Sequence, residues 1–188
     1  MPRCLNCKEK FEKKYPNQMG KFRYCLLKDD CIKAFNNARK KHQELQRKKA
    51  WRKEKKKLSE KLKTHKDWLK DLQKVFNTFI RLRDKNQPCI SCRTNKKNIQ
   101  YAAGHYYPMG NYSFLRFHED NVHKQCNMNC NMKLSGNLIE YRKHLLKKIG
   151  KDRLQWLEDN RHNELKLSIP EIKEKIKHYK QKIKDIES

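Results

Sequence analysis

Cys89-Ile-Ser-Cys92 and Cys126-Asn-Met-Asn-Cys130 enclose a segment that also contains Ala103-Gly104-His105-Tyr106 and Asn121-Val-His123. The first pair of cysteines is separated by two residues and the second pair by three. Each spacing lets one tight turn point two thiolates toward a common tetrahedral metal. The two pairs therefore predict a Cys4 zinc site that holds the ends of this segment together.

His105 ends the run Ile99-Gln-Tyr101-Ala-Ala-Gly-His, which has strand-like composition and precedes a loop containing Pro108 and Gly110. A strand would fix its backbone while the loop leaves its ring accessible. With an unperturbed pKa of about 6.5, a histidine is mostly neutral at cellular pH and can accept a proton. His105 is thus a candidate general base; the alternative is a satisfied, partly buried histidine without a chemical role.

The remaining four cysteines lie near the N-terminus, so all eight fall into two sets of four. A second structural zinc site is expected at Cys4, Cys7, Cys25 and Cys31. Its spacing is similar to a short zinc ribbon, which would either dock on DNA or cap the helix that follows. No signal peptide or apolar run of membrane-spanning length is present, so we expect reduced thiolates, no membrane association and a cytoplasmic protein.

The net charge is +27, from 48 Lys and Arg against 21 Asp and Glu. So large a surplus predicts a polyanionic partner, because neutralising phosphates releases counterions and adds affinity. The alternative is a solvated, partly disordered basic chain. Hydrophobic residues make up only 36% of the chain, so the core must be small and metal ions would help to stabilise it.

Residues 36–84 are free of Gly and Pro and rich in helix formers, which predicts one long basic helix. Its apolar residues recur with the period of a coiled coil. The predicted seam consists of Trp51, Leu58, Leu62, His65, Leu69, Leu72, Phe76 and Phe79. A second copy of the helix in a homodimer, or C-terminal helices that fold back, could cover it.

Arg39 to Lys66 contains 14 Lys or Arg and three Glu, a net charge of +11. We expect these side chains to contact phosphate without reading sequence, although a solvated helix face is the simpler alternative. The residues predicted to bind nucleic acid are Arg39, Lys40, Lys41, Arg47, Lys48, Lys49, Arg52, Lys53 and, outside this run, Lys124.

Three further helices are expected after the central segment. One carries the stripe Leu138, Tyr141, Leu145 and Ile149, and a short one contains Leu154, Trp156 and Leu157; Ser168-Ile-Pro-Glu171 is a capping box that opens the last. The expected organisation is a zinc-ribbon-like module at 1–35, the long helix at 36–84, a zinc-stapled domain at 85–150 and a helical extension at 151–188.

The order Cys-x2-Cys, Gly-His-Tyr, Asn five residues before Cys, then Cys-Asn, resembles the HNH (His-Me finger) nucleases. More narrowly, Leu115 to Cys126, Cys130-Asn131 and Leu134 to Arg142 resemble the NinG (Rap) family of recombination endonucleases of lambdoid phages. This resemblance runs from about residue 76 to 150. It implies a mainly helical fold around a small ββα-metal core, in which two strands and a helix surround one divalent ion.

The resemblance also implies roles for individual residues. His105 would be the general base, and Asn131 an oxygen ligand of a catalytic Mg²⁺ or Mn²⁺, unless it merely caps a helix. Asn121 would brace the loop that carries the base. His123 would be a second ligand of the ion or a phosphate contact, if it has a role beyond structure.

One position departs from the commoner HNH pattern. Many members have an acidic metal ligand directly before the base, and here that residue is Gly104. His118, Glu119, Asp120 or water would then have to complete the shell of the ion.

The family implies a structure-selective endonuclease that cleaves branched recombination intermediates, such as Holliday junctions and D-loops, during phage recombination. Two alternatives remain open from the sequence. One is an HNH nuclease without branch preference, and the other is a non-catalytic zinc protein that binds DNA or RNA.

Overall fold

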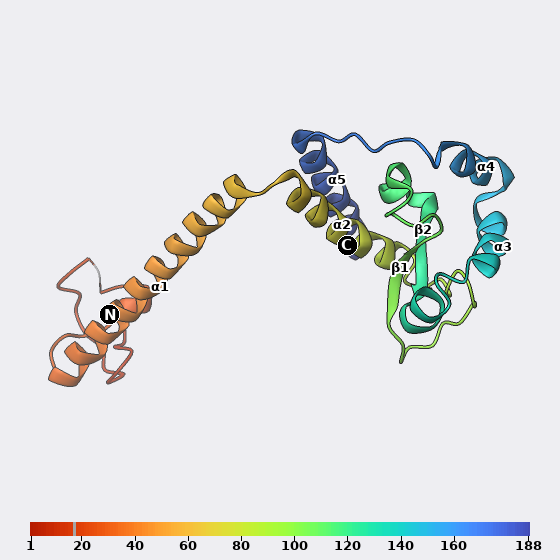
Figure 1. The fold of residues 1–188 in the computed structure, drawn as a ribbon. Coiled ribbons are helices and arrows are strands. Elements are labelled where there is room, and N and C mark those ends of the chain that lie inside the picture. The colour runs from red at the N-terminus through yellow and green to blue at the C-terminus, as the bar shows by residue number, and fades with distance from the viewer. Residues whose placement is uncertain (17) are drawn as a thin grey trace. The chain divides into compact units, whose positions relative to one another are not determined.

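The computed structural model of the chain describes residues 1–16 and 18–188. It consists of two compact units, Met1–Leu62 and Lys63–Ser188, which are described separately. The fold is mainly helical with one small sheet (Figure 1). The helices are α1 (Asp29–Leu62), α2 (His65–Arg83), α3 (Leu138–Ile149), α4 (Lys151–Asn160) and α5 (Ile169–Glu187), and the strands are β1 (Tyr101–His105) and β2 (Val122–Cys126). None of these helices has the length and hydrophobicity of a membrane span.

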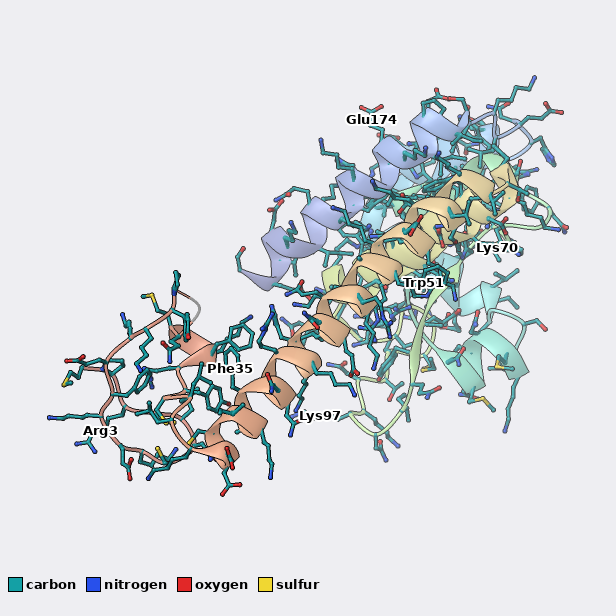
Figure 2. The ribbon with its side chains drawn as sticks, turned by 90° about the vertical axis from the view of Figure 1, so that its left-hand side faces the viewer. Arg3, Phe35, Trp51, Lys70, Lys97 and Glu174 are labelled. Carbon is teal, nitrogen blue, oxygen red and sulfur yellow. The ribbon has the colours of Figure 1, made fainter. Side chains whose placement is uncertain are left out.

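The first unit has a very small core. Phe11 is buried together with the N-terminal cysteines, and Phe35 of α1 packs edge-on against Phe22 and Tyr24, with ring centroids 6.3 and 6.0 Å apart. Figure 2 labels Phe35 close to the N-terminal loops. Beyond Phe35, the side chains of α1 are almost all exposed. So little apolar burial cannot fold a module of this size without help, which is the situation in which zinc sites are found.

The prediction of one continuous helix over residues 36–84 is wrong, because the chain has two helices there. α1 begins earlier, at Asp29, and ends at Leu62, and α2 begins at His65. The break is a capping box: the Thr64 hydroxyl accepts a hydrogen bond from the Asp67 amide, and the Asp67 carboxylate accepts one from the Thr64 amide at 3.2 Å. These bonds satisfy donors that only a helix start leaves free.

The predicted seam is divided by this break. On α2, Leu72, Phe76 and Phe79 are buried against α5, where Tyr179 packs on Phe76 with ring centroids 5.0 Å apart. Helices α2 and α5 run side by side in Figure 1. The fold-back of a C-terminal helix, one of the two expected partners, therefore covers this part. Trp51, Leu58 and Leu62 of α1 are 63%, 57% and 72% exposed, so nothing within their own unit covers this part of the seam, and the homodimer stays a prediction.

The two strands form an antiparallel pair in which His105 lies opposite Val122 and Gly104 opposite His123. Val122 belongs to the core between the sheet, α2 and α5. The other face of the sheet is covered by α3, whose Tyr141 hydroxyl donates to the Gly104 carbonyl at 2.9 Å.

The three C-terminal helices occur where the sequence predicts them. Tyr141, Leu145 and Ile149 of α3 are buried in a second core with Leu154 and Leu157 of α4. α3 ends at Gly150, whose φ of 83° lies in the left-handed region that glycine favours. The capping box at Ser168 and Glu171 starts α5.

Candidate active site and cysteine clusters

The central cysteine cluster joins three separate segments. The Sγ atoms of Cys89, Cys92, Cys126 and Cys130 all lie within 4.8 Å of one another, as expected around a tetrahedral zinc ion. The Cys126 amide donates to the Cys89 sulfur at 3.3 Å. Burial and neighbouring sulfurs raise the pKa of Cys130 to about 11, so zinc must displace protons when it binds. The donor set fits zinc and can hold one ion.

The N-terminal cluster has the same donor set. The sulfurs of Cys4 and Cys31 are 3.8 Å apart, as are those of Cys7 and Cys25, and all four lie within 4.8 Å of one another. Sulfurs about 2.3 Å from a common tetrahedral zinc would be separated by about 3.8 Å. Asn6 donates to the Cys31 sulfur at 3.6 Å, a contact that would stabilise a thiolate. This cluster can hold a second zinc ion.

His105 and Asn131 line one cavity of about 370 Å³. His105 enters it from the end of β1, and Asn131 from the π-helical segment Asn127–Lys133 that follows β2. Gln73 and Asn77 of α2 contribute a third wall. Two of the three residues expected to form the catalytic site therefore face the same space.

The hydrogen bonds of His105 determine which ring nitrogen can act as a base. Its Nε2 lies 3.0 Å from the main-chain oxygen of Arg116, which can only accept, so Nε2 carries the proton. Nδ1 is left with its lone pair. Burial lowers the pKa of His105 below its usual value near 6.5, although the bond to the Arg116 carbonyl acts in the opposite direction. The ring is therefore neutral near pH 7.

Asn121 is completely buried and binds the β1–β2 connection from within. Its Oδ1 accepts from the Tyr107 amide at 2.8 Å, and its Nδ2 donates to the carbonyls of Tyr107 and Leu115, both at 3.0 Å. This loop includes Arg116, whose carbonyl holds the ring of His105. Asn121 thus acts on the candidate base through the loop and does not line the cavity.

The sequence predicts Asn131 at the start of the next long helix, and the structure does not place it there. A left-handed turn at Ser135, Gly136 and Asn137 intervenes, and α3 begins only at Leu138. The Asn131 side chain donates through Nδ2 to the Asn127 side-chain oxygen at 3.4 Å. Its own Oδ1 has no hydrogen-bond donor among the described residues and can serve as a ligand.

His123 is not part of this cavity, which corrects its predicted role as a ligand or phosphate contact. Its register partner is Gly104 rather than His105, so the two histidines project from opposite faces of the sheet. His123 is 3% exposed. Its Nδ1 accepts from Arg83 at 2.9 Å and from Lys148 at 3.1 Å, while Nε2 donates to the Asp120 carbonyl at 3.1 Å.

A buried carboxylate completes the network around His123. Asp84 at the end of α2 is 3% exposed and binds Arg83 at 2.8 Å and Lys148 at 3.3 Å. Against the effect of its burial, the positive charges of Arg83 and Lys148 hold the pKa of Asp84 far below its usual range. Its Oδ2 also accepts from the Lys124 amide at 3.1 Å. The network therefore ties α2, β2 and α3 together.

Lys124 is also an internal residue, which corrects its predicted contact with nucleic acid. The side chain is buried, and its Nζ donates to the carbonyls of Lys85 and Gln87 and to the Asn95 side chain at 2.7–3.0 Å. It also lies 4.2 Å from the centre of the Tyr101 ring. A charge committed in this way stabilises the knuckle before β1 and is unavailable to phosphate.

The side chains suggested as replacements for the missing acidic ligand are engaged elsewhere. None of the three lines the cavity. Glu119 binds Lys182 at 2.6 Å, Asp120 binds Arg153 at 2.8 Å, and His118 stacks on Trp156 with ring centroids 4.7 Å apart. Water and substrate are left to complete the shell of an ion bound at Asn131.

Gly104 cannot be replaced by an acidic residue in this packing. A Cβ atom at position 104 would lie 2.2 Å from Oε1 of Gln125, which is completely buried beside it. The packing of Gln125 against the sheet therefore requires glycine where the commoner HNH pattern has an acidic residue. The side chain of Gln125 occupies the volume in which an acidic side chain would begin.

Sequence reasoning missed two polar residues that line the cavity and an arginine that binds one of them. Gln73 and Asn77, one turn apart on α2, are linked by a hydrogen bond of 2.7 Å, and Arg116 donates through Nε to Gln73 at 2.7 Å. The available signal was a pair of amides at i and i+4 on the helix face beside the apolar stripe. Only the structure places that face next to His105.

The eight basic residues predicted on the long helix, from Arg39 to Lys53, are all exposed on α1. Among residues 1–16 and 18–188, no carboxylate forms a salt bridge with any of them. Both units are basic: the first has 21 Lys and Arg against 7 Asp and Glu, and the second has 27 against 14. Each unit alone could therefore attract a polyanion.

Comparison with known proteins gives consistent results. A family model described as "Bacteriophage Lambda NinG protein" matches residues 1–188. "Protein ninG" of Escherichia phage lambda is 43% identical over 125 residues, which cover 66% of this chain and 60% of that protein. "Protein ninG" of Escherichia phage 933W (42%, covering 66% and 61%) and of Salmonella phage P22 (41%, covering 66% and 60%) match similarly. The chain thus spans about 60% of the length of these relatives. No solved structure matches it.

Proposed function

Since the chain belongs to the NinG family, we propose that it is a metal-dependent DNA endonuclease that cleaves branched recombination intermediates such as Holliday junctions and D-loops. The observation that carries this proposal is the shared cavity, in which the neutral ring of His105 and the free amide oxygen of Asn131 come together. The family relationship carries the branch preference and the place in phage recombination, in the cytoplasm of the host cell.

In this proposal His105 is the general base of phosphodiester hydrolysis. Nδ1 accepts a proton from the attacking water, and Nε2 keeps its own proton in the bond to the Arg116 carbonyl. The depressed pKa of His105 keeps Nδ1 unprotonated at pH 7. Asn121 positions the base by holding the connection between the two strands.

Asn131 is the proposed protein ligand of a catalytic divalent ion. A bound Mg²⁺ or Mn²⁺ would polarise the phosphate and neutralise charge in the transition state. The amide oxygen of Asn131 is a hard donor that suits both ions, and Mg²⁺ commonly keeps several waters and binds through few protein ligands plus substrate phosphate. Because Gly104 supplies no carboxylate, the DNA itself is expected to contribute to ion binding.

The basic surfaces capture the substrate in this proposal. Exposed lysines and arginines of α1 meet phosphates, which gives affinity that falls steeply with salt and carries no base preference. The two cysteine clusters are structural. The central one joins the Cys89–Cys92 knuckle to the end of β2 and to the segment that carries Asn131.

Substitution of His105 tests the proposal directly. Zinc-loaded wild type, with Mg²⁺ or Mn²⁺, is expected to cut a four-way junction faster than linear duplex at matched salt. His105→Ala should bind the junction almost as well as wild type and cut it at least ~100-fold more slowly in single turnovers, the usual scale for losing a general base. His178→Ala, at an exposed position on α5, is the matched control.

Three other outcomes would change the conclusion. Equal cutting of junction and duplex would indicate a nuclease without branch preference. Failure of the wild type to cut any DNA with either ion would favour a non-catalytic zinc protein that binds nucleic acid. Undiminished cutting by His105→Ala would exclude this residue as the base.

A further inference from the structure

Arg116 combines partial burial with the absence of an anionic partner. Among the described residues, no carboxylate lies within ion-pair distance of its guanidinium. Burial alone lowers the pKa of Arg116 from its usual value, with no acidic group acting against it. Arg83 shows the contrast, since it is also partly buried but binds Asp84 at 2.8 Å. A partly desolvated, unpaired cation is unfavourable unless an anion joins it.

The guanidinium of Arg116 is oriented by one hydrogen bond and one aromatic contact. Its Nε donates to Oε1 of Gln73 at 2.7 Å, and its Cζ lies 5.1 Å from the centre of the Phe117 ring. The Gln73 amide is itself oriented, because its Nε2 donates to Asn77 at 2.7 Å. The terminal nitrogens of Arg116 have no acceptor among the described residues. An oriented guanidinium with free terminal donors is suited to a planar array of phosphate oxygens.

Arg116 is also tied to the candidate base. Its carbonyl accepts the Nε2–H of His105, and Gln73 and Asn77, which orient its side chain, line the same cavity as His105. No carboxylate lines that cavity. The positive charge of Arg116 is therefore not neutralised locally by the protein, and an entering phosphate would be its first counter-ion.

We infer that Arg116 binds the scissile phosphate of DNA and stabilises the charge that develops on its non-bridging oxygens, and that Gln73 and Asn77 position its guanidinium. The inference rests on the proposed function and adds a phosphate-binding residue to it. Arg116 keeps all its protons throughout the reaction. Arg116 holds the base through its carbonyl and the phosphate through its side chain. The loop that carries Arg116 therefore sets the distance between the attacking water and the phosphorus.

Four variants of the full chain separate this role from general electrostatics. Arg116→Gln removes both the charge and the terminal N–H donors of the guanidinium, and Arg116→Lys keeps only the charge. Gln73→Glu keeps Arg116 but replaces its amide partner by a carboxylate. Arg81→Gln is the control, because it removes an equal charge from an exposed site on α2, where the side chain donates a hydrogen bond to Thr78.

Single-turnover cleavage of a four-way junction at saturating protein measures the chemical step, and binding at matched salt is measured separately. Arg116→Gln should be ~100-fold slower or more, the scale for removing one donor to a transition-state oxyanion. Its junction affinity should fall no further than that of Arg81→Gln. Arg116→Lys should recover only part of the rate, and Gln73→Glu should be at least ~10-fold slower although its fold is intact. A cleavage rate of Arg116→Gln within threefold of the rate of Arg81→Gln would overturn the inference.

A measurement without DNA cleavage keeps the inference separate from the proposed function. Inorganic phosphate is titrated into ¹⁵N-labelled, zinc-loaded protein, and the Nε–H resonance of Arg116 is followed by NMR. Saturable movement of this resonance in wild type, and its loss in Gln73→Glu, would support the phosphate site even if no DNA were cut. An Arg116 resonance that does not respond to phosphate would refute the site while leaving the role of His105 untouched.

Discussion

The ring of His105 donates through Nε2 to the main-chain oxygen of Arg116 at 3.0 Å, across 11 positions of sequence. The bond joins the end of β1 to the loop that returns to β2. It fixes the tautomer of the ring, since a carbonyl oxygen cannot donate. The chemistry that we propose at Nδ1 depends on this contact at the opposite nitrogen.

Cleavage should lose rate on acidification only below pH 6.5. A general base works in its neutral form, so activity is retained above its folded-state pKa and lost as the pH falls through that value. Burial depresses the pKa of His105 below 6.5. The fall in rate on the acid side of the pH profile therefore moves to lower pH. Single-turnover rates between about pH 5 and pH 8 on a four-way junction would locate the limb. An inflection clearly above pH 6.5 would contradict the burial of the ring.

Asn121→Ala should both destabilise the Lys63–Ser188 unit and slow cleavage. The change leaves the Tyr107 amide and the carbonyls of Tyr107 and Leu115 without a buried partner. We expect a loss of about 3 kcal/mol or more, since three groups lose their partner and each unsatisfied buried group costs about 1–3 kcal/mol. Urea unfolding measures the loss, and Asn111→Ala, at an exposed position of the same loop, is the control. Equal stability of the two variants would refute a bracing role for Asn121.

Each cysteine cluster should bind one zinc ion independently. Cys130→Ser is expected to lower the zinc content from two ions per chain to one and to unfold the Lys63–Ser188 unit, because the central cluster joins three of its segments. Cys31→Ser should remove the other ion and leave that unit folded. Metal analysis together with circular dichroism during thermal unfolding tests both statements. Full zinc content in either variant would show that the affected cysteine is not a ligand.

Lys124 and Lys48 should respond oppositely to removal of their charge. Lys124→Met breaks three hydrogen bonds of a buried ammonium group, so it should lower stability and leave the salt dependence of DNA binding unchanged. Lys48→Gln lies on the exposed face of α1 and should leave stability unchanged. If Lys48 contacts phosphate, its loss reduces the slope of log K against log salt by about one. Titrations at several salt concentrations decide between the two roles.

The two halves of the predicted coiled-coil stripe should differ in energetic importance. Leu72 is 0% exposed between α2 and α5, whereas Leu58 on α1 is 57% exposed. Leu72→Ala is expected to cost about 2–5 kcal/mol, through lost burial and the cavity that remains. Leu58→Ala should change stability by less than about 0.5 kcal/mol. A large loss at Leu58, measured by urea unfolding at several protein concentrations, would indicate that a second copy covers α1.

Local features of this protein could be predicted from its sequence. Ligand spacing assigns the eight cysteines to two sets, because a short loop between two thiols constrains them to one metal. The boundaries of α3 and α5 follow from Gly150 and from the Ser168–Glu171 capping box, which act within one helical turn. Family membership, read from Leu115 to Arg142, is confirmed by the match over residues 1–188. The break at Thr64 could also have been predicted, since Asp67 completes a capping box. The strong helix propensity on both sides of Thr64 favoured one continuous helix instead.

Only the tertiary structure decided which residues share the cavity. The two histidines His105 and His123 lie on opposite faces because of the register between β1 and β2, and a shift of one residue would exchange them. Register is set by packing against α2 and α3, which no local pattern encodes. The same long-range packing buries Lys124, places α5 on α2 and brings Gln73 beside Arg116. Spacing along the chain can therefore specify a metal site or a helix end, whereas the polar groups around a cavity depend on which distant segments fill the remaining volume.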